Sequence, residues 1–224
     1  PTPPLARTVT DDLGRFVLRG APAGPGTTLV VQKGRWRRAV QVSVTACVDQ
    51  ALPTEATRLP RGRGEGDLPR MAVAVGDFDA IECVLRSVGV GAEEFTAPGG
   101  PGAVHLYDNE IPGGGGAPGG VNVRELVSSL ERMLRYQLVF LNCADVTNSA
   151  DLLKDPQVRR NLVDYVRRGG RLYVTDWSYD WLQQPEPLAP YMCFEDDLPC
   201  TVTTPHGFQA ATGPGRGGPP TPFS

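Results

Sequence analysis

The sequence predicts a protein of the α/β class, in which a domain with a parallel sheet is preceded by part of a β-sandwich. Between residues 8 and 45, short apolar runs are separated by turns that contain Gly and Pro, and Val40–Val44 alternates strictly between apolar and polar residues, which is the period of half-buried strands. From residue 71 onwards, short apolar runs alternate with segments whose apolar residues recur every three or four positions. Strands that alternate with helices in this way form parallel sheets covered by helices.

Residues 1–50 are expected to form the carboxyl-terminal part of a small sandwich. Asp11–Gly14 predicts a turn, because Asp favours the first turn position and Gly tolerates a positive φ. Strands are expected at Arg15–Leu18, Leu29–Val31 and Val40–Val44. So few strands do not close a sandwich, and we expect the remaining ones upstream of this sequence.

Residues 51–69 are rich in Pro, Gly and Arg and show no periodicity, so we expect a linker and a domain boundary there. Residues 70–210 are expected to form the α/β domain. Residues 211–224, which are rich in Gly and Pro, are expected to be a disordered tail. The predicted strands of the α/β domain are Met71–Val75, His105–Tyr107, Gln137–Leu141 and Arg171–Thr175.

Three helices are expected between these strands. The first begins at Asp79, which forms a capping box with Glu82. The second begins at Asn122, and the third begins after Asp155 and ends before Gly169. The apolar residues expected to be buried are Ile81, Val84, Leu85 and Val88 in the first helix, and Val123, Leu126, Val127, Leu130 and Leu134 in the second.

The stretch Thr-Asp-Asp-Leu-Gly-Arg-Phe at residues 10–16, followed by Pro22–Gly24 and Thr28–Val31, resembles the carboxyl-terminal half of carboxypeptidase regulatory-like domains. These domains are transthyretin-like sandwiches without catalytic residues. The resemblance therefore implies a turn and a strand at these positions and no catalytic group.

The runs Tyr136–Asn142, Leu162–Val166 and Gly169–Val174 resemble the class I glutamine amidotransferase-like fold and its trehalose-utilisation relatives. The resemblance implies a flavodoxin-like parallel sheet. The family's nucleophilic Cys lies in a Gly-x-Cys-x-Gly turn, which corresponds here to the region of Asp176–Trp177, where no Cys is found. The Cys-His-Glu triad therefore does not carry over. The whole arrangement resembles uncharacterised secreted proteins and lipoproteins of myxobacterial type.

Charge and cysteine content bear on partners and compartment. The 22 basic and 25 acidic residues give a net charge of −3, which does not indicate a nucleic-acid partner. No apolar run approaches the ~20 residues of a membrane span. Five Cys without a Cys-x-x-Cys motif, and only two His, favour disulfides over a structural zinc site. We therefore expect an exported protein that is periplasmic, extracellular or an outer-membrane lipoprotein.

Two disulfides are expected. Cys193 and Cys200 flank a short acidic turn, and their spacing suits a local bridge. Cys83 points away from the apolar face of the first helix, and Cys47 is its expected partner, with Cys83–Cys143 as the competing pair. Cys143 then remains as a thiol at the end of a buried strand, where burial and a nearby carboxylate disfavour the thiolate and predict slow reactivity.

Ligands of open parallel sheets bind beyond the carboxyl ends of the strands. The candidate ligand-binding residues at these ends are Asp77, Asn142, Cys143, Asp176 and Trp177. Asp77 and Asp79 together suit a cation, but helix capping by Asp79 is the favoured interpretation.

The sequence therefore predicts a non-catalytic exported binding or cell-surface protein, with a saccharide or a protein as the expected kind of ligand. It assigns no catalytic residue, no metal and no cofactor, and it leaves the oligomeric state open. The alternative is a hydrolase-type enzyme that acts at the strand ends around Asp77, Cys143 and Asp176. A reactive thiol would favour the enzyme, and a bound ligand without turnover would favour the binding protein.

Overall fold

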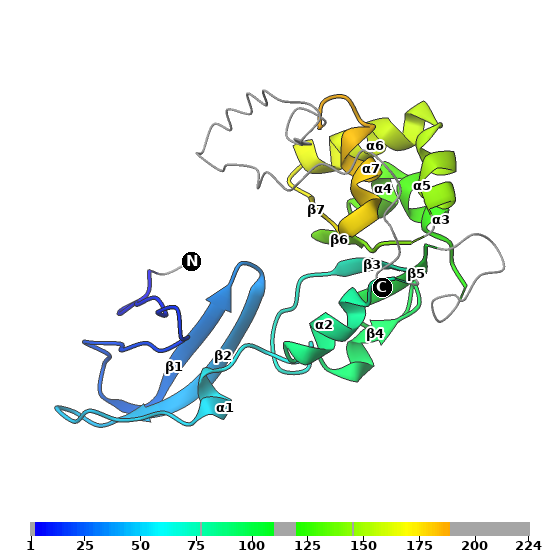
Figure 1. The fold of residues 1–224 in the computed structure, drawn as a ribbon. Helices are drawn as coiled ribbons and strands as arrows, with labels where there is room; N and C mark the ends of the chain where they lie inside the picture. Colours follow the sequence, from blue (N-terminus) through cyan, green and yellow to red (C-terminus); the bar gives the residue numbers. More distant parts are fainter. Residues whose placement is uncertain (1–2, 77, 110–119, 145, 189–224) are drawn as a thin grey trace, which may run out of the picture. The chain divides into compact units, whose positions relative to one another are not determined.

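A computed structural model describes residues 3–76, 78–109, 120–144 and 146–188 (Figure 1). The chain divides into two compact units, Pro1–Leu68 and Pro69–Ser224. The division coincides with the end of the segment expected to be a linker. The predicted tail lies outside the described residues.

The regular structure of the first unit is an antiparallel hairpin of β1 (Gly24–Lys33) and β2 (Trp36–Val44). These strands contain two of the three predicted segments. The third, Arg15–Leu18, is not a strand, although the turn before it is present, with Asp11 Oδ1 accepting the backbone N–H groups of Leu13 and Arg15. In the described part of this unit, β1 and β2 are the only strands, so the structure contains a hairpin where a partial sandwich was expected.

The segment expected to be a linker packs on this hairpin. Its short helix α1 (Thr54–Thr57) is followed by a segment that meets β2 twice. The Trp36 indole N–H donates to the carbonyl of Pro60 at 3.0 Å. The backbones of Arg37 and Asp67 exchange two hydrogen bonds, at 2.8 and 2.9 Å. These contacts assign residues up to Leu68 to the first unit.

Arg58 holds this segment together. Its guanidinium donates two hydrogen bonds to the Glu65 carboxylate, at 2.6 and 2.8 Å, and one to Glu55 at 2.7 Å. The hydrogen bonds from Arg58, and then the N–H of Arg61, lower the pKa of the Glu65 carboxyl from 4.5 to about 2. A carboxyl group whose pKa falls on folding stabilises the folded state above its unfolded pKa, and this contribution is lost as the pH falls.

We therefore expect Glu65→Gln to weaken the first unit at pH 7 and to have progressively less effect between about pH 4.5 and pH 2, where the wild-type carboxylate is itself protonated. The Trp36 indole N–H signal in NMR spectra, followed during urea titrations at several pH values, measures this. Asp12→Asn, at an exposed position, is the control. An equal loss at pH 7 and pH 2 would contradict the assigned role of Glu65.

The second unit contains a five-stranded parallel sheet with the order β4-β5-β3-β6-β7, which confirms the α/β class. The first strand in chain order, β3, lies at the centre between β5 and β6. In the flavodoxin order 2-1-3-4-5, the first strand lies instead between the second and third. The second strand here, β4, is a two-residue edge strand that the sequence analysis missed. The strands are β3 (Met71–Val75), β4 (Phe95–Thr96), β5 (Val104–Asp108), β6 (Leu138–Leu141) and β7 (Arg171–Val174).

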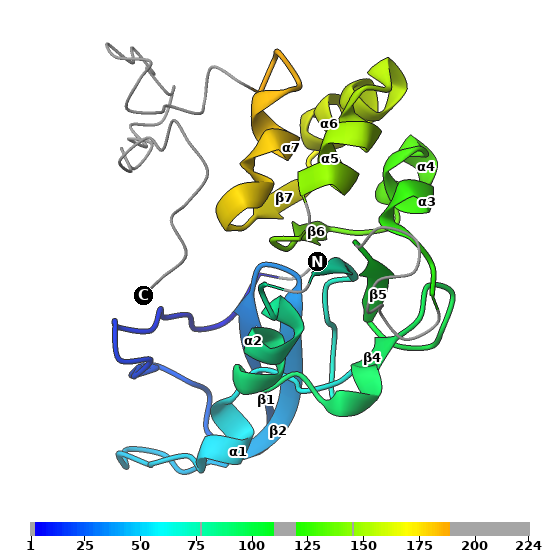
Figure 2. The ribbon, with the colours of Figure 1, turned by 45° about the vertical axis from the view of Figure 1, so that its right-hand side comes forward.

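Helices cover the two faces of this sheet unequally. Figures 1 and 2 show α2 on one side and α3 to α7 on the other. The main apolar core lies on the second side, where Ala72, Ala74, Val139 and Leu141 of the sheet meet helix residues such as Leu126. The helical segments are α2 (Ile81–Ser87), α3 (Val123–Val127), α4 (Leu130–Met133), α5 (Val146–Leu153), α6 (Pro156–Arg167) and α7 (Asp180–Gln183), with short 3₁₀ turns η1 (Ala92–Glu94) and η2 (Asp176–Tyr179).

One of the three predicted helices is present as expected, and the other two differ in part from the prediction. The start of α6 is confirmed, because Asp155 Oδ1 accepts the N–H of Gln157. The prediction of the buried face of the first helix was wrong, since Val84 and Val88 are 54% and 68% exposed. The reason is that α2 is short and begins at Ile81, with one well-buried residue facing the sheet. The second helix is interrupted at Ser129, which caps α4 by accepting the N–H of Arg132.

Candidate functional site

Asn142, the first residue after β6, links the loops that follow three strands. Its backbone carbonyl accepts hydrogen bonds from Asn109 Nδ2 after β5, at 3.0 Å, and from Ser178 Oγ in η2, at 2.8 Å. Its side-chain Nδ2 donates to the carbonyl of Asp79 and to Glu82 Oε2, each at 3.3 Å. The side chain is fully buried, so these bonds form in a poorly solvated environment.

The backbone of Cys143, the residue after Asn142, is also held by hydrogen bonds. Its backbone N–H is shared between Thr175 Oγ1 at 2.9 Å and Asp79 Oδ2 at 3.2 Å. The residue is only 4% exposed. These contacts correct the predicted capping box, because the residue that caps α2 is Ala80 and no side chain accepts its first N–H groups. Asp79 and Glu82 instead point toward the end of β6.

The close approach of the loop after β6 also explains why residue 76 is a glycine. Gly76 directly follows β3, and a Cβ atom there would lie 2.2 Å from the carbonyl oxygen of Cys143. A glycine at this position is therefore required for the close approach of the β3 and β6 ends.

The orientation of the Asn142 amide is fixed by its partners. Both groups that face Nδ2 are acceptors, so an exchange of Nδ2 and Oδ1 would bring oxygen against oxygen. Within the described residues, Oδ1 has no hydrogen-bond partner. An acceptor that lacks a partner in a buried position costs about 1–3 kcal/mol.

Asp176 stands at the turn from β7 into η2. It is exposed, and its φ is +39°, a conformation that is uncommon for a residue with a side chain. Such a conformation costs about 1–3 kcal/mol and is often found at binding sites. Of the other predicted site residues, Asp77 lies outside the described residues, and Trp177 belongs to η2 but its side chain is likewise outside the description.

Among the described residues, no basic side chain is paired with the carboxylates around these strand ends. In the described ranges, no Lys or Arg forms an ion pair with Asp79, Glu82, Asp176 or Asp180. Burial raises the pKa of Asp180 above its usual value. A negatively charged site repels anions such as phosphate and favours ligands that donate hydrogen bonds or carry positive charge.

The histidine of the described region serves elsewhere. His105 is buried on β5, with Nε2 facing the carbonyl of Gly100 at 3.3 Å. Because that carbonyl can only accept, Nδ1 accepts from the hydroxyl of Tyr136, at 2.7 Å, and Tyr136 in turn meets Tyr107 at 3.0 Å. His206 lies outside the described residues. No cluster of three or more His, Cys, Asp or Glu suited to a metal occurs in the residues that the structure describes.

Neither of the two predicted disulfides is present in the described residues, and both stay predictions. Cys193 and Cys200 lie outside the described residues, so their bridge stays a prediction. Cys47 and Cys83 are exposed, as expected for Cys83, and the structure contains no disulfide between them or with Cys143. They belong to different units, and their pairing also stays a prediction. The next helix after Cys143 was expected to begin after Asp155, but α5 begins at Val146.

The site also contains residues that were not expected from the sequence. Thr175 and Asn109 each directly follow a strand, which is a signal that could have indicated them. Glu82 was interpreted as a capping residue, and Ser178 gave no signal in the sequence. Comparison of the chain with protein-family models, curated proteins and solved structures finds no match. None of the described helices is long and apolar enough to cross a membrane.

Proposed function

We propose that the second unit is a non-catalytic binding module of an exported or cell-surface protein, and that its ligand binds at the carboxyl ends of β3, β6 and β7. The observation that carries this proposal is the exposed, strained Asp176 beside the buried network of Asn142 and Cys143. A rigid hydrogen-bonded base with an exposed carboxylate can position a ligand without any reacting group.

The acidic character of the site narrows the ligand. Carboxylates without countercharge accept hydrogen bonds from hydroxyl and amine groups, and they disfavour phosphate. A saccharide with free hydroxyl or amino groups therefore suits the site best, and a protein segment that presents such groups is the second ligand class.

The test is binding of the full chain to an array of neutral, amino and phosphorylated glycans. We expect neutral or amino glycans to bind and phosphorylated ones not to bind. Asp176→Asn should raise Kd by roughly 10- to 100-fold, because a hydrogen bond to a charged group contributes about 1.5–3 kcal/mol. Asp164→Asn, on the partly exposed side of α6, is the matched control. Binding that is insensitive to Asp176→Asn, or that favours phosphorylated glycans, would contradict this site.

One observation favours the alternative, a hydrolase-type enzyme. Asp176 occupies a strand-to-helix turn with positive φ, as nucleophiles of several hydrolases do. The burial of Cys143 speaks against a thiol nucleophile. Rapid iodoacetamide labelling of Cys143 at pH 6, or turnover of a bound glycan, would favour the enzyme.

The proposal extends to the family relations of the two units. We infer a relation to the class I glutamine amidotransferase-like fold, supported by the parallel sheet and by Asp176 standing at the turn where that fold carries its nucleophile. The first unit is proposed to derive from a carboxypeptidase regulatory-like domain, supported by the β1–β2 hairpin and the Asp11 turn.

A further inference from the structure

The edge of the sheet at β7 offers backbone groups for pairing. The N–H groups of Arg171 and Thr175 donate to carbonyls of the β6 side, Gln137 and Leu141. In a parallel pair, alternate residues face the neighbouring strand, so the backbone groups of the residues between them face outward. Among the described residues, no strand pairs with this outer side of β7. An edge of this kind is a template for a further strand.

An apolar groove runs along the same edge. It has a volume of about 750 Å³ and is formed by α6, β7, α7 and the segment after α7. Its apolar lining includes Val163, Val166, Leu172, Leu182 and Leu188. The groove can therefore receive apolar side chains from a strand that pairs with β7.

The opposite face of β7 provides a second contact. Tyr173 is 53% exposed, and its ring packs on Phe140 with the centroids 5.5 Å apart. Side chains of an added strand alternate between the two faces of the sheet. One set would enter the groove, and the other would pass beside Tyr173.

The charge of the groove indicates the chemistry of its partner. Arg167 and Arg171 are among the residues that border the groove, and both are exposed; because side chains alternate along a strand, that of Arg171 leaves β7 on the face of Tyr173. The contact of Arg167 with Asp164 is long, at 3.7 Å, and such exposed pairs contribute little. Both guanidinium groups therefore remain accessible to a carboxylate from a bound segment.

We propose that β7 and this groove bind an extended segment of a partner protein that carries alternating apolar residues and an acidic end. The segment pairs with the outward backbone groups of Leu172 and Val174, inserts apolar side chains into the groove, and places its carboxylates against Arg167 and Arg171. Binding by strand addition takes affinity from the main chain and selectivity from these pockets. The site is separate from the one at the carboxyl ends of the strands.

The test uses the full chain with a synthetic acidic peptide, acetyl-TVTVTVDE, and three control peptides in which the acidic end is replaced by lysines, the central valine is replaced by proline, or the order is scrambled. Hydrogen exchange at the amides of Leu172 and Val174 reports on pairing. We expect both amides to exchange rapidly in the free chain and at least tenfold more slowly with the acidic peptide. The proline and scrambled peptides should give no protection.

Charge reversal provides the matched pair of variants. Arg171→Glu should raise Kd for the acidic peptide at least tenfold and improve binding of the lysine-ended peptide, whereas Arg160→Glu, on an exposed part of α6, should do neither. Two results would overturn the proposal in favour of another occupant. Slow exchange of both amides in the free chain at all concentrations would mean that this chain covers its own edge, and protection that rises with protein concentration would mean a second copy. Failure of the acidic peptide to protect the amides would reject strand addition altogether.

Discussion

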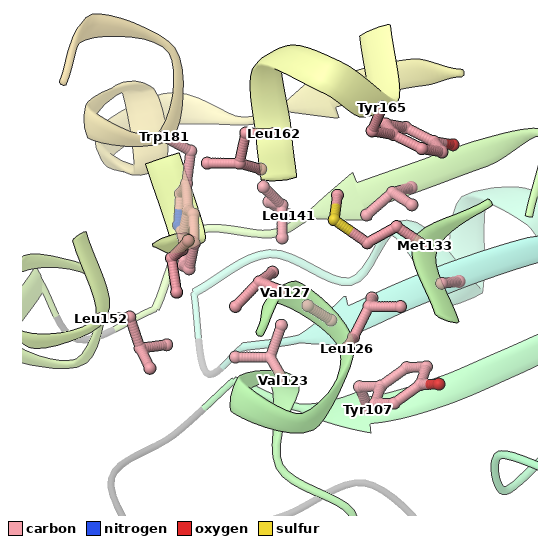
Figure 3. Packing of buried hydrophobic residues seen from close by; sticks show 14 of the residues in the cluster. Tyr107, Val123, Leu126, Val127, Met133, Leu141, Leu152, Leu162, Tyr165 and Trp181 are labelled. Carbon is pink, nitrogen blue, oxygen red and sulfur yellow. The ribbon is translucent and has the colours of Figure 1, made fainter. Parts of the chain in front are cut away.

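Replacement of Trp181 by Ala is expected to lower the free energy of unfolding of the second unit by about 3–5 kcal/mol. Among the described residues, Trp181 is the largest fully buried side chain, and it belongs to the main core together with residues such as Leu152 and Leu162. Figure 3 shows its ring at one end of that cluster. Removal of the ring would leave a cavity that neighbouring helices and strands cannot fill without moving. Urea unfolding followed by far-UV circular dichroism measures the loss, because most of the helix lies in this unit.

A conservative variant separates packing from hydrogen bonding at this position. The indole Nε1 of Trp181 has no hydrogen-bond partner among the described residues. Trp181→Phe keeps much of the buried ring and removes this donor, so it should cost clearly less than Trp181→Ala. A loss below about 1 kcal/mol for Trp181→Ala would show that the core does not depend on this ring.

Gly76→Ala is expected to disrupt the site more than any single change to its polar side chains. The added Cβ would meet backbone atoms of Cys143, the oxygen at 2.2 Å and the carbon at 2.9 Å. Backbone atoms cannot rotate away as a side chain can, and the Cys143 backbone is held just after β6 by its hydrogen bonds to Thr175 and Asp79, so the ends of β3 and β6 must separate. Overpacking of this kind costs roughly 1–3 kcal/mol and occasionally more. The separation should also break the contact between Asp79 and the Cys143 amide.

Two measurements test this variant. The unfolding midpoint of the second unit should fall, and hydrogen exchange of the Cys143 amide should accelerate, since its acceptors move away. Gly64→Ala is the matched control, because a Cβ at Gly64 would have no neighbour within 4 Å. Unchanged exchange at Cys143 in Gly76→Ala would show that the two strand ends do not need to approach so closely.

Several features of this protein could be predicted from local sequence because their physical causes are local. The start of α6 depends on Asp155 and Pro156, two adjacent residues that fix the first turn. Its end depends on Gly169, whose φ of +88° suits only a residue without a side chain. The strands β3, β5, β6 and β7 coincide with short apolar runs, which favour strands that are buried or half-buried. The α/β class and the position of the strand ends followed from these elements.

The roles of Asp79 and Glu82 were decided by tertiary structure. Their spacing suits a capping box, and sequence reasoning had no means of weighing that interaction against partners 60 or more residues away. Those partners are Asn142 and Cys143, which the pairing of β3 with β6 brings beside them. A buried amide group and a buried backbone N–H need acceptors more than an exposed helix start does, because water satisfies the latter.

The same reason explains the contacts within residues 51–69 and the exposed face of α2. Arg58 is paired because the chain returns Glu65 to it, and Val84 is exposed because no described element covers that side of α2. The sequence by itself determined which segments become strands and helices, through periodicity and end signals. The strand order and the hydrogen-bonded hub at Asn142 depended on contacts between distant segments, whose energies are set by burial and cannot be read from neighbouring residues alone.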